Sequence, residues 1–262
     1  MKYSLRTNVK RLIGKQHPHR DRQYRFIQRV KRLFRRHGAP VISVDAKKGE
    51  LIGNFKNAGK AWCVAAEEVN TYDFPSDSDG KATPYGIYDQ AANHAFVMLG
   101  VSAVTAAFAV ASIRRWWQTF GRPRYADAKH LLIECDGGGC NGHRPRLWKF
   151  ELQKLADDTG LAITVCHYPS GASKWNPIEH RLFSQISKNW AGYPLRSLRR
   201  ILGFIRGTTT ETGLTVDAEV DRRTYEKGLK ISDRQMRSLN LKRRRFCPNL
   251  NYTIRPTESG SS

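Results

Sequence analysis

Between residues 131 and 190, short apolar runs alternate with segments whose apolar residues recur every three to four positions. The runs cover 131–135 and 161–166, and the helical faces that follow them have apolar positions at Trp148, Leu152, Leu155, Ile178, Leu182, Ile186 and Trp190. Strand–helix alternation predicts parallel strands covered by helices, because each helix has an apolar face to bury. This pattern restricts the chain to the α/β class.

The first half of the chain adds strands of a different kind. Residues 41–44 form a short apolar run, and 85–88 with 95–99 predict an antiparallel hairpin around a polar turn. A helix is predicted over 103–119. The order β, β, β, α, β, α, β, α predicts a mixed five-stranded sheet flanked by helices. The Gly-, Asn-, Ser-, Asp- and Pro-rich residues 53–83 predict a long inserted loop.

Residues 95–113 are uncharged, and their length and flanks alone would permit a membrane span. However, the stretch is rich in alanine and its period changes in the middle. Residues 95–101 have the pattern of a buried strand, whereas Val110 and Ile113 lie on one helical face. We therefore predict a strand followed by a core helix, and no membrane partner.

The formal net charge of +22 is concentrated in two segments. Residues 1–40 carry 13 Lys and Arg against one acid, and residues 222–245 carry 10 against two acids. Because each neutralised phosphate releases condensed counterions, such charge predicts a polyanionic partner. An ordinary solvated basic surface explains one run, but two runs around a near-neutral middle favour nucleic acid.

These features divide the chain into three expected segments. Residues 1–38 are expected to form a basic helical segment and residues 39–200 a central α/β domain. Residues 201–262 are expected to form a basic C-terminal extension. Five cysteines without a CxxC pair favour a reducing cytosol over a disulfide framework.

Three acids lie where strands end or a helix begins. Asp45 closes the first strand, Asp136 closes the fourth, and Glu179 lies in the first turn of the helix after the fifth. Side chains at the carboxyl ends of neighbouring strands converge on one crevice. Converging acids repel one another unless cations lie between them, and oxygen ligands suit Mg²⁺ or Mn²⁺. Two such ions can activate an attacking water and stabilise the leaving oxygen of a phosphodiester.

Each acid also has a purely structural explanation. Asp45 can begin a turn, and Asp136 can head the glycine turn that follows it. Glu179 can complete a capping box with Asn176, with Pro177 at the first helical position. The joint placement of the three acids is what favours chemistry.

Two other motifs occur near the second acid. The segment 137–142 matches GxGxxG between a strand and a helix, the context of a dinucleotide site, but the next strand ends at 166–168 without the expected acid. Cys140 and His143, with the pair at 166–167, suggest a zinc site, although the spacing matches no structural-zinc pattern well. Both alternatives are disfavoured.

Four segments resemble the ISAzo-type insertion-sequence transposases, also called the Rhodopirellula transposase family. They are VISVDAKKGELIGNFKNAG (41–59), PYGIYD (84–89), LLIECDGGGCNGHRPRLWK (131–149) and CHYPSGASKWNPIEHRLFS (166–184). The resemblance covers residues 3–255. It implies a ribonuclease-H-like fold with a DDE catalytic triad, which falls on Asp45, Asp136 and Glu179. Residues 176–179 are also similar to the last motif of mariner-like transposases.

The resemblance implies cleavage and strand transfer of double-stranded DNA, at element ends and target, without a covalent protein intermediate. The triad would ligate two Mg²⁺ or Mn²⁺ ions. The residues expected near DNA are Lys47, Lys48, Lys174, Trp175, Arg181, Lys242, Arg243 and Arg244. Trp175 either stacks on an unpaired base or anchors its loop. His167 and His180 flank the predicted site, where they either position DNA or water or serve as hydrogen-bonded structural histidines.

Members of this family carry a further N-terminal region of helix-turn-helix character, and Met1 lies close to where that region should finish. We expect a catalytic core with weak sequence specificity, cytoplasmic and nucleoid-associated in a prokaryote, acting as a homodimer on DNA or together with full-length transposase. Two alternatives stay open: a non-catalytic DNA-binding regulator and another ribonuclease-H-like nuclease.

Overall fold

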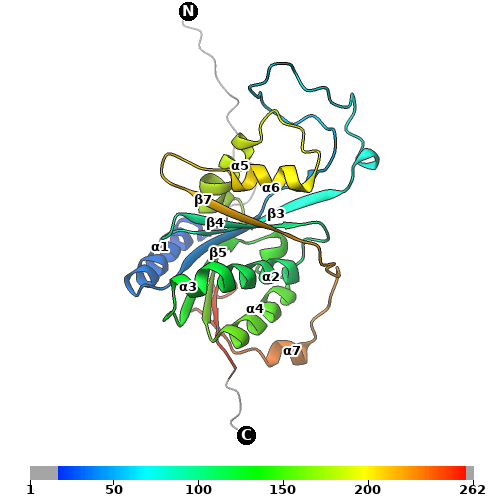
Figure 1. The fold of residues 1–262 in the computed structure, drawn as a ribbon. Coiled ribbons are helices and arrows are strands. Elements are labelled where there is room, and N and C mark those ends of the chain that lie inside the picture. The colour runs from blue at the N-terminus through cyan, green and yellow to red at the C-terminus, as the bar shows by residue number, and fades with distance from the viewer. Residues whose placement is uncertain (1–16, 258–262) are drawn as a thin grey trace, which may run out of the picture.

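The computed structural model describes residues 17–257, which are organised around one nine-stranded sheet (Figure 1). Its strands are β1 (Val41–Ala46), β2 (Glu50–Leu51), β3 (Lys81–Asp89), β4 (His94–Gly100), β5 (His130–Asp136), β6 (Ala162–Tyr168), β7 (Thr215–Asp221), β8 (Leu241–Arg243) and β9 (Asn251–Ile254). The order across the sheet is β7-β4-β3-β1-β5-β6-β9-β8, and β2 pairs with β3.

The five predicted strands form the centre of this sheet. β3 is antiparallel to both β1 and β4, whereas β5 is parallel to both β1 and β6. This pairing confirms the predicted mixed sheet and the predicted hairpin. It also makes β1 and β5 direct neighbours that end at the same edge of the sheet.

Helices cover both faces of the sheet. They are α1 (Arg20–Arg36), α2 (Ala106–Trp116), α3 (Arg122–Arg124), α4 (Arg146–Thr159), α5 (Ser184–Asn189), α6 (Leu198–Arg206) and α7 (Asp233–Arg237). Apolar residues of α2 and α4 pack on one face, and those of α1, α5 and α6 pack on the other. Figure 1 shows α2 and α4 on the opposite side of the sheet from α5 and α6.

Residues 95–113 divide as predicted into strand and helix. β4 ends at Gly100, and the Thr105 hydroxyl caps α2 by accepting a hydrogen bond from the Phe108 N–H. Within residues 17–257, no helix combines the length and apolar character that crossing a membrane requires.

The C-terminal segment differs from the expected extension. β7 pairs in parallel with β4, and β9 pairs with β6, so residues 201–257 complete both sides of the sheet. Sequence reasoning missed β7, although the alternation of Asp217 and Glu219 with its buried Val216 and Ala218 is the pattern of a half-buried strand. The predicted loop at 53–83 is present but shorter, since β3 already begins at Lys81.

Helix α1 confirms the helical part of the predicted basic segment, and residues 1–16 of that segment lie outside the described residues. Its Ile27 and Phe34 are buried against the sheet. The buried Lys31 ammonium lies 3.0 Å from the Glu134 carboxylate of β5, which also accepts a hydrogen bond from the Tyr168 hydroxyl. These contacts fix α1 on the sheet.

Gly86 of β3 lets the segment after β6 approach the sheet closely. It pairs with Asp45, and a Cβ at this position would lie 2.8–2.9 Å from side-chain atoms of Ile178, Leu182 and Phe183. Those residues flank or belong to the π-helical turn Glu179–Phe183 that precedes α5. A side chain at position 86 would therefore push this turn away from Asp45.

We expect Gly86→Val to destabilise the fold by about 1–3 kcal/mol, because three packed side chains must move. The melting temperature should fall by roughly 2–4 °C for each kcal/mol. Gly203→Ala in α6 is the matched control, since no atom lies within 4 Å of its added Cβ. Equal melting temperatures for both variants would contradict this account of Gly86.

Candidate active site

The predicted acids leave the sheet on one face and at one edge. Val44 pairs with Cys135, and both side chains are buried in the cluster under α2 and α4. Because side chains alternate along a strand, the next residues, Asp45 and Asp136, point to the opposite face. Glu179, the first residue of the π-helical turn, reaches the same place after β6. The structure therefore brings all three acids together.

A hydrogen-bonded clamp fixes the approach of this turn. The buried Ser43 hydroxyl, two residues before Asp45 on the same face, donates to the Asn176 side-chain oxygen. Ser43 Oγ also accepts from the Ile178 N–H at 3.1 Å. The fully buried Asn176 donates its amide to Asp136 Oδ1 at 3.3 Å. One serine and one asparagine thus tie β1, β5 and the turn together.

The capping box predicted for Glu179 is not formed. The turn begins without a side-chain cap, and the Asn176 side chain is used by Ser43 and Asp136 instead. The Glu179 carboxyl group interacts with Asp45 by charge and by a hydrogen bond. The structure thus favours the site over the structural explanation of this acid.

Burial and mutual repulsion make the two aspartates poor acids in the metal-free protein. Burial, followed by the charge of Asp136, raises the pKa of Asp45 to about 7, although a hydrogen bond from the Ala46 N–H opposes the shift. Burial and the charge of Glu179 raise the pKa of Asp136 to about 6, against the hydrogen bond from Asn176. Near pH 7 Asp45 is therefore only partly ionised, and a nearby cation would favour the ionised form of both acids.

The chemistry of this donor set fits a hard divalent cation, because it consists of carboxylate oxygens whose repulsion such an ion relieves. Within the described part of the chain, no three His, Cys, Asp or Glu residues stand in a ready-made metal-binding arrangement. In the metal-free protein the carboxyl groups interact with one another instead. Binding of such an ion here would require loss of protons and adjustment of these side chains.

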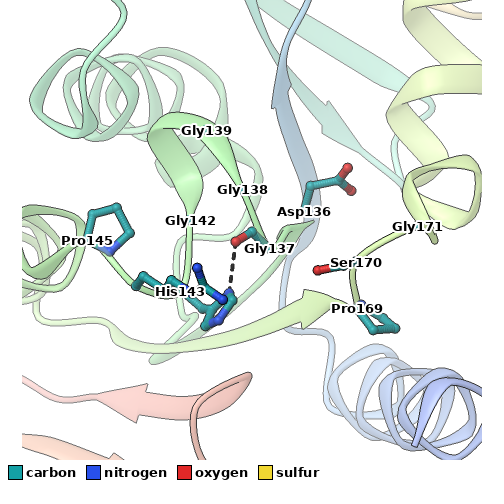
Figure 2. A pocket seen from close by; sticks show the side chains of 11 residues that line it. Asp136, Gly137, Gly138, Gly139, Gly142, His143, Pro145, Pro169, Ser170 and Gly171 are labelled. Atoms are coloured by element: carbon teal, nitrogen blue, oxygen red, sulfur yellow. Dashed lines mark hydrogen bonds between the residues drawn. The ribbon is translucent and has the colours of Figure 1, made fainter. Parts of the chain in front are cut away.

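A cleft of about 540 Å³ opens beside Asp136, between the glycine loop 137–142 and the segment 169–171. Figure 2 shows Gly137 between the Asp136 carboxylate and the His143 ring, and His143 Nδ1 lies 2.8 Å from the Gly137 carbonyl oxygen. A Cβ on Gly137 would lie 3.1 Å from the Tyr168 carbonyl oxygen. The backbone at Gly137 therefore passes too close to Tyr168 for a larger side chain, and Asp136 lies at the edge of this cleft.

The same loop differs from a dinucleotide-binding turn. Residues Gly139–Asn141 form a short 3₁₀ turn, and α4 begins only at Arg146, so the helix N-terminus does not follow the glycines directly. The buried Asn141 side chain accepts a hydrogen bond from the Tyr85 hydroxyl at 2.8 Å. The loop is therefore tied to β3, the strand next to the one that carries Asp45.

His167 is buried behind the site, in keeping with the second of its two predicted roles, that of a hydrogen-bonded structural histidine. Its Nδ1 lies 3.0 Å from the Asp136 carbonyl oxygen, and its Nε2 lies 3.1 Å from the Tyr252 hydroxyl. Burial lowers the pKa of His167 to about 3, so the ring is neutral. His180 is exposed, with Nε2 2.6 Å from the Lys174 carbonyl oxygen.

Trp175 serves as a loop anchor, the second of its two predicted roles. Its ring lies 5.0 Å from the Tyr24 ring, and the Arg20 guanidinium lies 4.4 Å from its centre. Both partners belong to α1. The turn that carries Asn176 is therefore tied to α1 as well as to β1.

The cations predicted to contact DNA differ in whether they are exposed or already paired with an acid. Lys47 is engaged with Glu50 at 2.8 Å, whereas Lys48, Lys174 and Arg181 are exposed. Lys242, Arg243 and Arg244 are exposed on or just after β8. Three strand spacings separate β8 from β5, so this cluster lies roughly 14 Å along the sheet from Asp136.

Sequence reasoning missed the residues that position the acids. Ser43 was the one available signal, because it is a single polar residue inside the apolar run 41–44. The second partner, Asn176, was assigned only a capping role. Gly86 carried no signal, since its function depends on a segment about 90 residues later.

Comparison with solved structures confirms the predicted ribonuclease-H-like fold. A Mos1 transposase paired-end complex with the left transposon end matches with a TM-score of 0.50 and 14% identity, covering 77% of this chain and 58% of the Mos1 chain. A mariner Mos1 paired-end complex with Mg matches with a TM-score of 0.51 and 14% identity, covering 78% and 58%. This chain thus spans less than two thirds of Mos1.

None of the curated proteins compared with the sequence matches it. The family described as the Rhodopirellula transposase DDE domain matches residues 1–256, a range that contains Asp45, Asp136 and Glu179. The match covers almost the whole chain and agrees with the four motifs, the fold and the gathered acids. The chain belongs to the Rhodopirellula transposase DDE domain family.

Proposed function

We propose that this chain is the catalytic domain of a DNA transposase that cleaves phosphodiester bonds at element ends and transfers the freed strand to target DNA. The observation that carries the proposal is the convergence of Asp45, Asp136 and Glu179, held by the Ser43–Asn176 clamp. The family match and the Mos1-like fold support it. Mos1 forms paired-end complexes, which supports a homodimer on DNA for this chain too.

In this proposal Asp45, Asp136 and Glu179 hold two Mg²⁺ or Mn²⁺ ions. When bound, such ions activate the attacking water or 3′-hydroxyl and stabilise the leaving oxygen. The Ala46 N–H orients the Asp45 carboxylate, and the Asn176 amide orients that of Asp136. Both donors are uncharged, so they position the acids without neutralising them. The exposed Lys48, Lys174 and Arg181 are expected to contact backbone phosphates.

We expect Asp136→Asn to abolish metal-dependent nicking and joining of supercoiled plasmid. Loss of several kcal/mol of metal-mediated stabilisation corresponds to a rate decrease of roughly 100-fold or more. Asp127→Asn, which removes an exposed carboxylate elsewhere, is the control. Unchanged cleavage by a folded Asp136→Asn protein would contradict the proposal. Joined strands indicate a transposase, nicks alone a nuclease, and neither product a regulator.

The raised pKa of Asp45 also predicts how stability depends on pH. Its pKa is higher in the folded protein, about 7 against 3.8, so its contribution to stability is complete below about pH 4 and is lost as the pH rises to about 7. Metal-free Asp45→Asn should therefore melt at a higher temperature than the native protein at about pH 8, with the difference shrinking toward about pH 5.

Thermal melting across this pH range, with and without Mn²⁺, measures the effect. The ion should stabilise the native protein at high pH and stabilise Asp45→Asn much less. If the native protein and the variant had the same melting temperature at every pH, folding would not raise the pKa of Asp45.

A further inference from the structure

The exposed side of α1 carries a row of five arginines. They follow spacings of three and four residues and are all exposed: Arg22, Arg25, Arg29, Arg32 and Arg36. Such spacing places them on one helical face, opposite the buried residues that contact the sheet. The row extends over 15 residues, and the 14 steps between its ends correspond to about 21 Å.

A second segment completes a groove beside this row. Arg244 and Arg245, which follow β8, face α1 across a cleft of about 770 Å³. We call this cleft, with its seven arginines, the arginine groove. Its floor is apolar, and no acidic residue lines it. Phe246 joins the two walls, because its ring lies 5.6 Å from the Phe26 ring and 4.6 Å from the Arg22 guanidinium.

The charges of the arginine groove are not compensated within residues 17–257. None of its seven arginines forms an ion pair there, whereas Arg115, Arg196, Arg200 and Arg223 each pair with a carboxylate elsewhere on the surface. Seven like charges around one groove repel one another. A polyanion would relieve that repulsion.

The arginine groove begins beside the catalytic edge. The first turns of α1 contact Trp175, next to Asn176 of the clamp. Near the other end of the helix, Phe34 lies 6.3 Å from the ring of His130, which begins β5. The groove therefore runs along the sheet from the catalytic edge toward the opposite edge.

We propose that the arginine groove holds the backbone of the double-stranded DNA that flanks the cleaved site. Successive phosphates of one strand rise ~3.4 Å along the axis while the strand winds around it, so a straight groove of about 21 Å faces a few consecutive phosphates of one strand. Guanidinium groups bind phosphate oxygens through paired hydrogen bonds. The lining lacks Asn, Gln, Ser and Thr side chains, which favours backbone binding without base recognition.

Two features favour a duplex over a single strand. Proteins that hold single strands stack bases on open aromatic faces. Here the Phe246 ring is already contacted by Arg22, Phe26 and His19. The groove also follows a rigid helix that is fixed to the sheet by the Lys31–Glu134 ion pair. The assignment rests on the proposed function for its connection to cleavage, but not for binding itself.

The test compares two triple variants that lose the same charge, both in the Asp136→Asn background so that DNA is not cut. The groove variant is Arg25→Ala, Arg29→Ala and Arg32→Ala, and the control is Arg222→Ala, Lys227→Ala and Lys230→Ala, three exposed cations outside the groove. Fluorescence anisotropy measures the affinity for a labelled duplex of about three helical turns at several salt concentrations.

The groove variant should bind at least about tenfold more weakly, and its log–log salt slope should fall by about 2 to 3, since each lost phosphate contact removes about 0.9. The control should lose far less, and replacement of the same three arginines by lysine should keep most of the slope. Equal losses in groove variant and control would overturn the proposal. So would a loss confined to single-stranded DNA.

Cleavage separates this proposal from the catalytic one. With Asp136 intact, the groove variant should need higher DNA concentrations than the native protein to nick plasmid, because its triad is untouched but its DNA binding is weakened. If neither protein cleaves but the groove variant alone loses duplex binding, the arginine groove stands and the catalytic proposal fails. Melting temperatures equal to that of the native protein should show that these exposed substitutions leave the fold intact.

Discussion

The organisation of this protein depends on holding three mutually repelling carboxyl groups together without neutralising them. Within the described residues, no Lys or Arg forms an ion pair with Asp45, Asp136 or Glu179. Uncharged donors from Ala46 and Asn176 orient the two aspartates instead. A buried salt bridge would consume the charge on which metal chemistry depends, whereas neutral hydrogen bonds fix geometry and leave the charge available.

The surrounding fold supplies what this arrangement requires. Adjacent parallel strands place two acids on one edge, and the bare backbone of Gly86 lets the third acid approach. The cations lie farther out, on α1 and after β8, where they can attract phosphates without forming pairs with the acids. In the proposed function, attraction of the polyanion is thus separated from the chemistry performed on it.

Much of this architecture could be predicted from the sequence, because the five central strands are short apolar runs that end at polar residues. Asp45 and Asp136 were found for the same reason. β7 was missed although its alternation of charged and buried residues is a strand pattern, and β9 because its four residues include the polar Asn251 and Thr253 and form no apolar run. The roles of Asn176 and His167 depend on contacts with distant segments, which local patterns do not contain. Those contacts exist only in the folded structure, where β1, β5 and β9 surround the two residues.

The pairing of β9 with β6 also has a consequence for synthesis. The triad is complete once residue 179 has been made, but β6 acquires its outer neighbour only with residues 251–254. Until then a strand of the catalytic sheet presents unpaired backbone groups, which can pair with other chains. During synthesis, the chain therefore contains all three acids well before the sheet that supports them can be completed.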